Sequence, residues 1–265
     1  MQLIHTLKSS TMIKESRHSL IIDMLMKQGS IQVSDLVEKL NVSSVTIRKD
    51  LTELEKLGKL YRSHGKAILI NPYINNRSVS DKEKIAPEAK RAIGQQGARL
   101  IDRDDSIIIA SGSTVHALAR AIQPIHRLTV VSASLVVSEI LALNENIDVI
   151  QLGGMLRHSS LSVVGQYSEK VLSKFSFSKL YLGVDGIDFE YGITTTDLRE
   201  AELNRKMMAA SQKIIVLADS SKFGRRGFAK IGDMEEVDII ITDPGISAKN
   251  VKAVEELGID LIIAR

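Results

Sequence analysis

Residues 42–54 have the sequence Val-Ser-Ser-Val-Thr-Ile-Arg-Lys-Asp-Leu-Thr-Glu-Leu. Three apolar residues, Ile47, Leu51 and Leu54, recur at i, i+4 and i+7, and this spacing predicts the buried face of a helix. Ser43 is a residue type favoured at helix N-caps, so we expect the helix to begin there and to run to about residue 57. The polar side chains on its exposed side are Ser44, Thr46, Arg48, Lys49 and Thr52.

Two shorter amphipathic segments precede this helix. Residues 17–26 and 35–40 each place apolar side chains one helical turn apart, and Ser16 and Ser34 are the expected N-caps. Gly29 interrupts the pattern between the two segments. A short turn then leads into the third helix, so the predicted order is helix, helix, turn, helix.

A hairpin is predicted to follow the third helix. Gly58 occupies the C′ position at which helices commonly end. Segments 60–62 and 67–70 flank the polar residues 63–65, as expected of two antiparallel strands. Three helices followed by a two-stranded wing are typical of a winged helix-turn-helix, in which the third helix enters the major groove of DNA.

The exposed side of the third helix suits contact with DNA. Short hydroxyl side chains near its N-terminus allow close approach to a groove, and the free N–H groups there favour phosphate. Arg48 and Lys49 add positive charge one turn later. An ordinary solvated helix and a protein-binding module are the alternatives to this interpretation. The expected DNA contacts are Ser43, Ser44, Thr46, Arg48, Lys49, Thr52, Arg62 and His64.

Positive charge is concentrated in the first third of the chain. Residues 1–84 hold 14 Lys and Arg against 9 Asp and Glu, whereas the remainder holds 21 against 23. This asymmetry suits a head that binds a polyanion, but alone it decides nothing. The absence of cysteine excludes disulfides and thiolate chemistry. No apolar run reaches the ~18 residues of a transmembrane helix and no signal peptide is evident, so we expect a cytoplasmic protein.

The pattern changes after the hairpin. We predict a winged head over residues 12–70, a polar linker over 71–81 and a second domain over 82–265, which opens with a helix over 82–100 interrupted at Pro87. Short apolar runs then alternate with amphipathic helices, which predicts an α/β fold with a mainly parallel sheet covered on both faces. The apolar runs are 106–110, 128–132, 147–152, 180–184, 213–218, 237–242 and 259–264.

Polar clusters follow five of these runs, at the carboxyl ends of strands where ligands bind in such folds. The segment 111–114, Ser-Gly-Ser-Thr, opens a helix and offers hydroxyls and N–H groups to a phosphate. Asp185 and Asp219 suit sugar hydroxyls, and Lys222 adds a cation. Each cluster alone is ordinary turn chemistry, but together they favour a small phosphorylated polyol as ligand. The expected contacts are Ser111, Gly112, Ser113, Thr114, Ser132, Ser134, Gly153, Gly154, Asp185, Gly186, Thr195, Asp219 and Lys222.

Longer motifs run through both halves of the chain. The head holds the run 42–51 together with Leu-Glu-Lys-Leu-Gly-Lys-Leu at 54–60 and Arg-Ser-His-Gly at 62–65. The second domain holds the Ser-Gly-Ser-Thr segment, the Gly-Gly pair, Leu-Gly-Val-Asp-Gly at 182–186 and Asp-Ser-Ser-Lys-Phe-Gly at 219–224. Over nearly the whole chain these motifs resemble the DeoR-type (DeoR/GlpR-like) bacterial transcriptional regulators.

The resemblance implies a repressor of a carbohydrate-metabolism operon that binds double-stranded operator DNA. It also implies a sensor domain similar in fold to ribose-5-phosphate isomerase and glucosamine-6-phosphate deaminase. The effector would be a phosphorylated sugar or related metabolite, with Thr114 and Lys222 at the phosphate. The family usually has a second glycine where this chain has Lys66, which we expect to add a phosphate contact, and an aspartate where this chain has Ala110.

An enzyme is the main alternative. A sugar-phosphate isomerase or deaminase with a DNA-binding head would use Asp185 and Asp188 as an acid–base pair. However, residues 189–206 contain no counterpart of the glycine-rich, lysine-containing segment of the isomerases. We therefore predict no enzymatic activity, no cofactor and no metal. The scattered histidines, expected at the surface, are His116, His126 and His158.

A ligand-controlled switch is the expected mechanism. A homo-oligomer, either a dimer or a tetramer, would place two heads on DNA half-sites separated by whole turns of ~34 Å. Effector binding at the edge of the sheet would change DNA affinity through residues 71–100. No membrane partner is expected.

Overall fold

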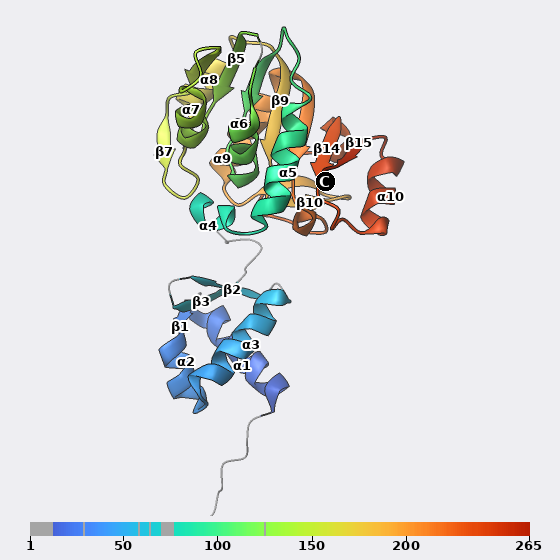
Figure 1. Ribbon diagram of the computed structural model, residues 1–265. Helices are drawn as coiled ribbons and strands as arrows, with labels where there is room; N and C mark the ends of the chain where they lie inside the picture. The colour runs from blue at the N-terminus through green and yellow to red at the C-terminus, as the bar shows by residue number, and fades with distance from the viewer. Residues whose placement is uncertain (1–12, 29, 58, 64, 70–76, 125) are drawn as a thin grey trace, which may run out of the picture. The chain divides into compact units, whose positions relative to one another are not determined.

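The chain forms two compact units, residues 1–71 and residues 72–265, and each is described by itself. The computed structural model describes residues 13–28, 30–57, 59–63, 65–69, 77–124 and 126–265. Figure 1 shows a small helical unit in blue and a larger unit built around a sheet. Most of the predicted linker, residues 71–76, lies outside the described residues, as do residues 12 and 70 at the ends of the predicted head.

Three helices and a three-stranded antiparallel sheet make up the smaller unit. Its third helix, α3 (Ser44–Lys56), has the predicted pattern, because Ile47, Leu51 and Leu54 are buried in the core of the unit. The other elements are α1 (Lys14–Gln28), β1 (Ser30–Gln32), α2 (Val33–Leu40), β2 (Leu60–Ser63) and β3 (Lys66–Leu69).

The structure confirms the three predicted helices and the hairpin, and it adds a strand. β3 pairs with both β1 and β2, so the wing belongs to a sheet in the order β1-β3-β2. Two capping predictions are wrong, because Ser16 lies inside α1 and Ser34 lies inside α2, whose N-cap is Gln32. Gly58 and His64 lie outside the described residues.

A seven-stranded sheet forms the centre of the larger unit, and its strands match the seven predicted runs. They are β4 (Ser106–Ile109), β5 (Leu128–Ser132), β6 (Ile147–Gln151), β9 (Phe177–Gly183), β12 (Ser211–Leu217), β14 (Ile239–Thr242) and β15 (Asp260–Ile263). Their order is β15-β14-β12-β9-β4-β5-β6, and every neighbouring pair is parallel. The carboxyl ends of all seven strands therefore lie along one edge of the sheet, and the α/β prediction is confirmed.

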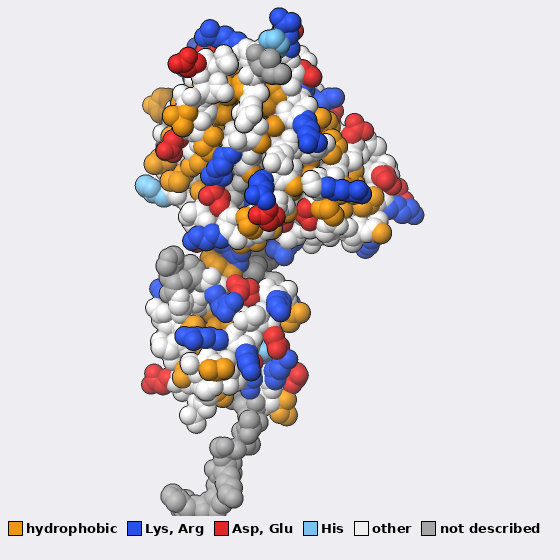
Figure 2. All heavy atoms as spheres, in the orientation of Figure 1, with side chains coloured by type: hydrophobic (Ala, Val, Ile, Leu, Met, Phe, Trp, Pro, Cys, Tyr) orange, Lys and Arg blue, Asp and Glu red, His pale blue; other side chains and the backbone are white. Residues whose placement is uncertain are grey.

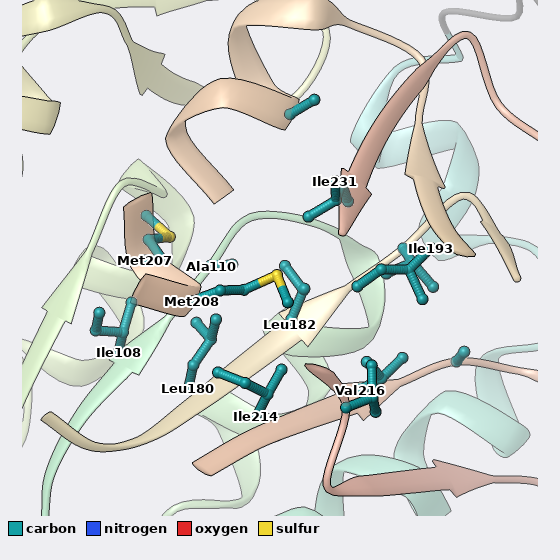
Figure 3. Packing of buried hydrophobic residues seen from close by; sticks show 14 of the residues in the cluster. Ile108, Ala110, Leu180, Leu182, Ile193, Met207, Met208, Ile214, Val216 and Ile231 are labelled. Atoms are coloured by element: carbon teal, nitrogen blue, oxygen red, sulfur yellow. The ribbon is translucent and has the colours of Figure 1, made fainter. Parts of the chain in front are cut away.

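Helices cover both faces of this sheet. On one face, Ile107 and Ile109 of β4 join a core with three helices, and on the other Ile108 joins a core with three further helices. Figure 3 shows the second core, in which Leu182 of β9 and Met208 lie in one buried cluster. The helices are α5 (Pro87–Ala98), α6 (Ser113–Ala121) and α7 (Leu135–Leu141) on the first face, and α8 (Gln166–Leu172), α9 (Leu198–Ala209) and α10 (Ala248–Glu256) on the second.

Five short strands, which the sequence patterns did not predict, lie beyond the main sheet. They are β7 (Met155–Arg157), β8 (Ser162–Val164), β10 (Gly186–Asp188), β11 (Gly192–Thr195) and β13 (Ala229–Gly232). β7 and β8 form a hairpin, and the other three form an antiparallel sheet in the order β10-β11-β13. Strands of three residues are too short for a period to be recognised, and the four-residue strands β11 and β13 contain glycine and polar residues in place of a uniformly apolar run.

The helix expected over residues 82–100 is two helices, α4 (Val79–Glu83) and α5. Pro87 occupies the first turn of α5, where its missing N–H costs nothing, and Ala86 before it has a left-handed φ of 47°. The predicted interruption at Pro87 is thus confirmed, but the first helix begins earlier than expected. Among the described residues, no helix is both long enough and apolar enough to cross a membrane.

Candidate functional site

The N-terminus of α3 is organised by Ser43. Its side chain accepts a hydrogen bond from the backbone N–H of Thr46 at 3.2 Å, which confirms the predicted N-cap, and the two hydroxyls lie 2.9 Å apart. Ser44 is exposed at the first position of the helix. This end of α3 therefore presents small polar groups and free backbone N–H groups to a partner.

The exposed face of α3 carries unpaired cations. Arg48 and Lys49 are exposed, and within the described residues neither forms an ion pair. Thr52 donates its hydroxyl to the carbonyl oxygen of Arg48 at 2.7 Å, so it is already satisfied within the helix. Val45 is 59% exposed on this helix, and the sequence analysis did not single it out. The sequence could have indicated Val45, because it is an apolar residue that does not belong to the buried face of the helix. Such a side chain can contact a thymine methyl group.

A buried ion pair fixes α3 against α1. Arg17 donates from Nη2 to Asp50 Oδ1 at 2.8 Å, and His18 Nε2 lies 3.2 Å from the same oxygen. Burial raises the pKa of Asp50, but the hydrogen bonds and charge of Arg17 outweigh this and hold the pKa below its usual value. This pair therefore sets the position of the exposed face of α3 relative to α1.

The wing contributes a cation that is already paired. Arg62 donates from Nε and Nη2 to Glu55 Oε2 at 2.9 and 2.8 Å, and its backbone N–H donates to Glu55 Oε1. Lys66 is exposed in β3. Figure 2 shows Lys and Arg side chains spread over the visible face of this unit.

A cavity lies at the carboxyl edge of the parallel sheet in the larger unit. It brings together seven of the residues predicted to contact a ligand: Ser111, Gly112, Ser113, Thr114, Asp185, Thr195 and Lys222. The lining residues that the sequence analysis missed are Arg77, Val79, Lys82, Arg157, Ser159, Ser160, Gly183, Val184, Glu200 and Asn204. Several of these come from outside the main sheet.

One wall of the cavity is the N-terminus of α6. Gly112 is the N-cap, and its φ of 129° is a conformation that side chains rarely adopt. Ser113 and Thr114 follow in the first turn, with only 7% and 6% of their surface exposed. No acidic side chain occupies this turn, so its N–H groups and hydroxyls form a site that attracts an anion.

Two cations face this wall, and they differ in their partners. Lys82 donates to Asp185 Oδ1 at 2.6 Å, while Thr195 donates to Asp185 Oδ2 at 3.1 Å. Burial would raise the pKa of Asp185, but Lys82 and Lys222 more than offset it and lower the pKa to about 2. The side chain of Lys222 has no hydrogen bond or ion pair within the described residues, and burial lowers its pKa. Lys222 is therefore the cation that is free to meet an anionic ligand.

A second carboxylate, Glu200, also lines the cavity. It belongs to the first turn of α9, and its oxygens accept from Ser111 and Thr195, each at 3.3 Å. Arg157 Nη1 lies 3.2 Å from Glu200 Oε1. The sequence could not indicate Glu200 as a lining residue, because its place in the cavity depends on how α9 packs against the sheet.

Other predicted contacts have structural roles and do not line the cavity. Ser132 is fully buried, donates to the carbonyl oxygen of Ile109 at 2.7 Å and accepts from the N–H of Ser134. Ser134 caps α7 by accepting from the N–H of Val137. Asp219 accepts from the N–H of Ser221 at 3.0 Å and caps the short 3-10 helix Ser220–Lys222. These side chains form the local hydrogen bonds that polar residues commonly make in turns.

The three remaining glycines also lie away from the cavity. Gly153 accepts a hydrogen bond from the hydroxyl of Ser168, and Gly154 has a φ of 153° with no room for a side chain beside the carbonyl of Val164. A Cβ at Gly186 would collide with the carbonyl oxygen of Arg225. Close packing of the backbone explains Gly154 and Gly186 without a ligand, whereas a Cβ at Gly153 would meet no neighbouring atom.

One prediction about histidine is wrong. His116 is fully buried in α6, with Nδ1 3.0 Å from Glu83 Oε1 and Nε2 3.1 Å from the hydroxyl of Ser134. Burial lowers its pKa, and a neutral ring that donates from Nδ1 and accepts at Nε2 satisfies both contacts. His126 and His158 are exposed, as expected.

The carboxylates considered for acid–base chemistry are not brought together in the cavity. Asp188 is absent from the lining, and its carboxylate is bound by Arg226 and by the N–H groups of Glu190 and Tyr191. Besides Asp185, the described lining contains the carboxylate of Glu200, which accepts hydrogen bonds from hydroxyls and forms an ion pair with Arg157. Among the described residues, no group of His, Asp and Glu has the arrangement of a metal site.

The architecture defines a class of protein: a winged helix-turn-helix joined to an α/β ligand-sensing unit. Residues 17–73 match the DeoR-like helix-turn-helix domain, and residues 85–244 match the DeoR C terminal sensor domain. The chain belongs to the DeoR family of transcriptional regulators.

The sequences of two transcriptional repressors match this chain over almost its full length. A protein of Escherichia coli O157:H7 named for repression of the aga operon is 36% identical over 93% of each chain. The glycerol-3-phosphate regulon repressor of Escherichia coli K12 is 30% identical over 94% of this chain and 100% of its own. The protein is therefore a regulator of transcription and not an isomerase or deaminase.

Similarity to solved structures is lower. Ribose 5-phosphate isomerase A from Neisseria gonorrhoeae is 20% identical, with 52% of this chain and 53% of that chain covered and a TM-score of 0.37. The parallel sheet order itself, and not this similarity, establishes the α/β architecture.

Proposed function

We propose that this protein represses an operon of carbohydrate metabolism and that a phosphorylated sugar or related metabolite in the cavity controls its affinity for operator DNA. The observation that carries the proposal is that one cavity holds the N-terminus of α6 and the side chain of Lys222, which forms no hydrogen bond or ion pair with the residues that the structure describes. The name of the glycerol-3-phosphate regulon repressor, a relative over the whole chain, points to the same ligand chemistry.

On the DNA side, α3 supplies the contacts. Arg48 and Lys49 are cations without an ion pair among the described residues, and Val45 adds an apolar group at the end that enters a groove. Arg62 can bind a phosphate only if its ion pair with Glu55 breaks or is shared with the phosphate. The complete proposed set is Ser43, Ser44, Val45, Thr46, Arg48, Lys49, Thr52, Arg62, His64 and Lys66, with His64 outside the described residues.

On the ligand side, we assign the phosphate to Lys222, Ser113 and Thr114. A carboxylate accepts hydrogen bonds and so suits the hydroxyls of a sugar. We therefore assign Asp185 and Glu200 to the hydroxyl groups of the ligand. Ser132, Ser134, Gly153, Gly154, Gly186 and Asp219 support the surrounding turns instead.

A single head covers one DNA half-site, so we propose that a homo-oligomer, a dimer or a tetramer, binds the operator. Its site of action would be the bacterial cytoplasm, where the operator DNA is. Residues between the head and α5 would carry the ligand signal, as expected from the sequence.

Two matched pairs of variants test the proposal. Arg48→Ala should weaken binding to the native upstream DNA by about 1–3 kcal/mol in a fluorescence anisotropy titration. Lys56→Ala removes a charge about 12 Å further along the same helix and should have a smaller effect. Equal losses in the two variants would contradict a specific role of the N-terminal half of α3.

The ligand is tested by thermal shift with a panel of sugar phosphates and their unphosphorylated counterparts. A phosphorylated compound should stabilise the wild type, and Lys222→Ala should abolish most of that shift without changing DNA affinity. Lys252→Ala, which removes an exposed lysine of α10, is the control. Stabilisation of Lys222→Ala equal to that of the wild type would refute the assigned phosphate site.

A further inference from the structure

Helix α4 forms a wall of the cavity that does not belong to the sheet. Val79 and Lys82 of α4 line the cavity together with the loops that follow β4 and β9. α4 is also the first helix of the larger unit, whose boundary with the head unit falls between residues 71 and 72. The cavity is therefore complete only when α4 lies against the edge of the sheet.

On the cavity side, one ion pair connects α4 to the sheet. Lys82 Nζ lies 2.6 Å from Asp185 Oδ1, at the end of β9, and the two side chains are 24% and 17% exposed. A backbone hydrogen bond from Val79 N to Ser159 O, at 2.6 Å, joins the other end of α4 to the β7–β8 hairpin. Both contacts lie at the rim of the same cavity.

Away from the cavity, Glu83 anchors α4 to α6. Its carboxylate accepts from His116 Nδ1 and from Arg120 Nη2, both at 3.0 Å, and Glu83 is not part of the cavity lining. Burial tends to raise the pKa of Glu83, but these hydrogen bonds outweigh it and hold the pKa low. α4 is thus held by contacts at the cavity, which a ligand there can reach, and by a contact through Glu83, which lies outside the cavity lining.

The C-terminal end of α4 rests on a buried lysine of α5. Lys90 is 4% exposed and donates from Nζ to the carbonyl oxygens of Lys82 and Ile85, each at 2.5 Å. Burial lowers the pKa of Lys90 to about 8. A helix of five residues is not stable on its own, so these few polar contacts decide whether α4 stays in place.

We infer that α4 is the element of the sensor that responds to ligand: a phosphorylated ligand contacts both Lys82 and the edge of the sheet, and thereby holds α4 in place. This inference rests on the proposed function, since it takes the cavity to be the effector site. A ligand that binds only the docked state shifts the docking equilibrium by a factor of 1 + [L]/Kd. Because α4 is the first helix after the head, its docking is the property through which the ligand acts on the connecting segment.

Hydrogen exchange of the full-length protein, measured by mass spectrometry, tests the inference. Inorganic phosphate is the probe, with sodium chloride at the same ionic strength as the reference. At about ten times the Kd of phosphate, exchange in peptides covering residues 79–86 should slow about tenfold. Amides at the N-terminus of α6, residues 113–115, should also be protected, because they are the proposed phosphate donors.

Variants separate a contact through Lys82 from a general stabilisation. In Lys82→Met, phosphate should still protect residues 113–115 but should no longer slow exchange in 79–86. Lys82→Arg keeps the charge and should retain the response, which shows that a loss in Lys82→Met is not misfolding. Arg91→Met, which removes an exposed residue of α5 paired only with Glu88, should behave like the wild type.

The outcomes distinguish the inference from the proposed function. Protection of residues 113–115 without any change in 79–86 overturns the role of α4 and leaves the phosphate site intact. Protection of neither region at saturating phosphate overturns both. A Lys82→Met variant that responds like the wild type also overturns the inference, because α4 would then be stabilised without its cavity contact.

Discussion

The face of α3 and the cavity of the sensor use positive charge in opposite ways. On α3, Arg48 and Lys49 are exposed and unpaired within the described residues. In the cavity, Lys82 is bound to a carboxylate at 2.6 Å and Arg157 lies 3.2 Å from Glu200. A cation in water needs no partner, whereas a desolvated cation is costly unless it is paired.

This difference predicts how each surface meets its ligand. Exposed lysine and arginine contribute affinity through release of counterions from DNA, so salt should weaken that contact steeply. A ligand in the cavity instead meets cations that are already bound inside the protein, such as Lys82 with Asp185, together with the Lys222 side chain, for which the described residues supply no hydrogen bond or ion pair. Where the ligand replaces an internal ion pair, binding changes contacts inside the protein, whereas binding at α3 need not.

The largest expected effect comes from the buried ion pair of the head. Asp50→Ala removes the buried carboxylate that Arg17 binds and should destabilise the head by about 3–5 kcal/mol. Hydrogen exchange should show lost protection in α1 and α3 while the parallel sheet is unchanged. Glu53→Ala breaks only an exposed pair with Lys14 and serves as the control. Unchanged protection in Asp50→Ala would show that the pair is not needed.

An intermediate effect is expected from acid in the sensor. The pKa of Asp185 is lowered to about 2 from 3.8, so its ionised form stabilises the folded state above pH 4, and this contribution is lost as the pH falls from about 4 to 2. The shift corresponds to about 2 kcal/mol. Thermal unfolding of the wild type and Asp185→Asn should therefore differ by a constant amount between pH 7 and 5, and the difference should shrink below pH 4. A difference at pH 2.5 as large as that at pH 5 would contradict this assignment.

The smallest effect should come from converting a paired cation on the head into a free one. Glu55→Gln releases the charge of Arg62, and DNA binding should strengthen by less than about 1 kcal/mol, with a slightly steeper dependence on salt. Anisotropy titrations at several salt concentrations measure both quantities, with Glu53→Gln as the control. Weaker binding would instead mean that Glu55 holds Arg62 in the orientation that DNA requires.

The head was predictable because its information is local. Ile47, Leu51 and Leu54 lie one helical turn apart, and their burial follows from periodicity alone. The parallel strands were predictable for a similar reason, since each is a short, uniformly apolar run. The strand β1 was not predicted, because three residues are too few to show a period.

The cavity was predictable only in part, and the order of strands explains which part. The clusters after β4 and β9 meet there because these strands are neighbours, and Lys222 arrives from the loop after the adjacent β12. The clusters after β5 and β6 lie further along the sheet and serve their own turns. Lys82, Arg157 and Glu200 come from α4, β7 and α9, and the position of these elements depends on tertiary packing that no local pattern encodes.

The strand order also bears on how the protein is made. β9 lies between β4 and β12 in the sheet, although the chain reaches β9 about 70 residues after β4 and β12 later still. Contacts so distant in sequence form slowly, and domains generally fold from the N-terminus as the chain leaves the ribosome. The head is complete by Leu69, whereas the cavity has to wait for Lys222. Each newly synthesised chain therefore carries a finished reading head for a time before it has the sensor that governs it.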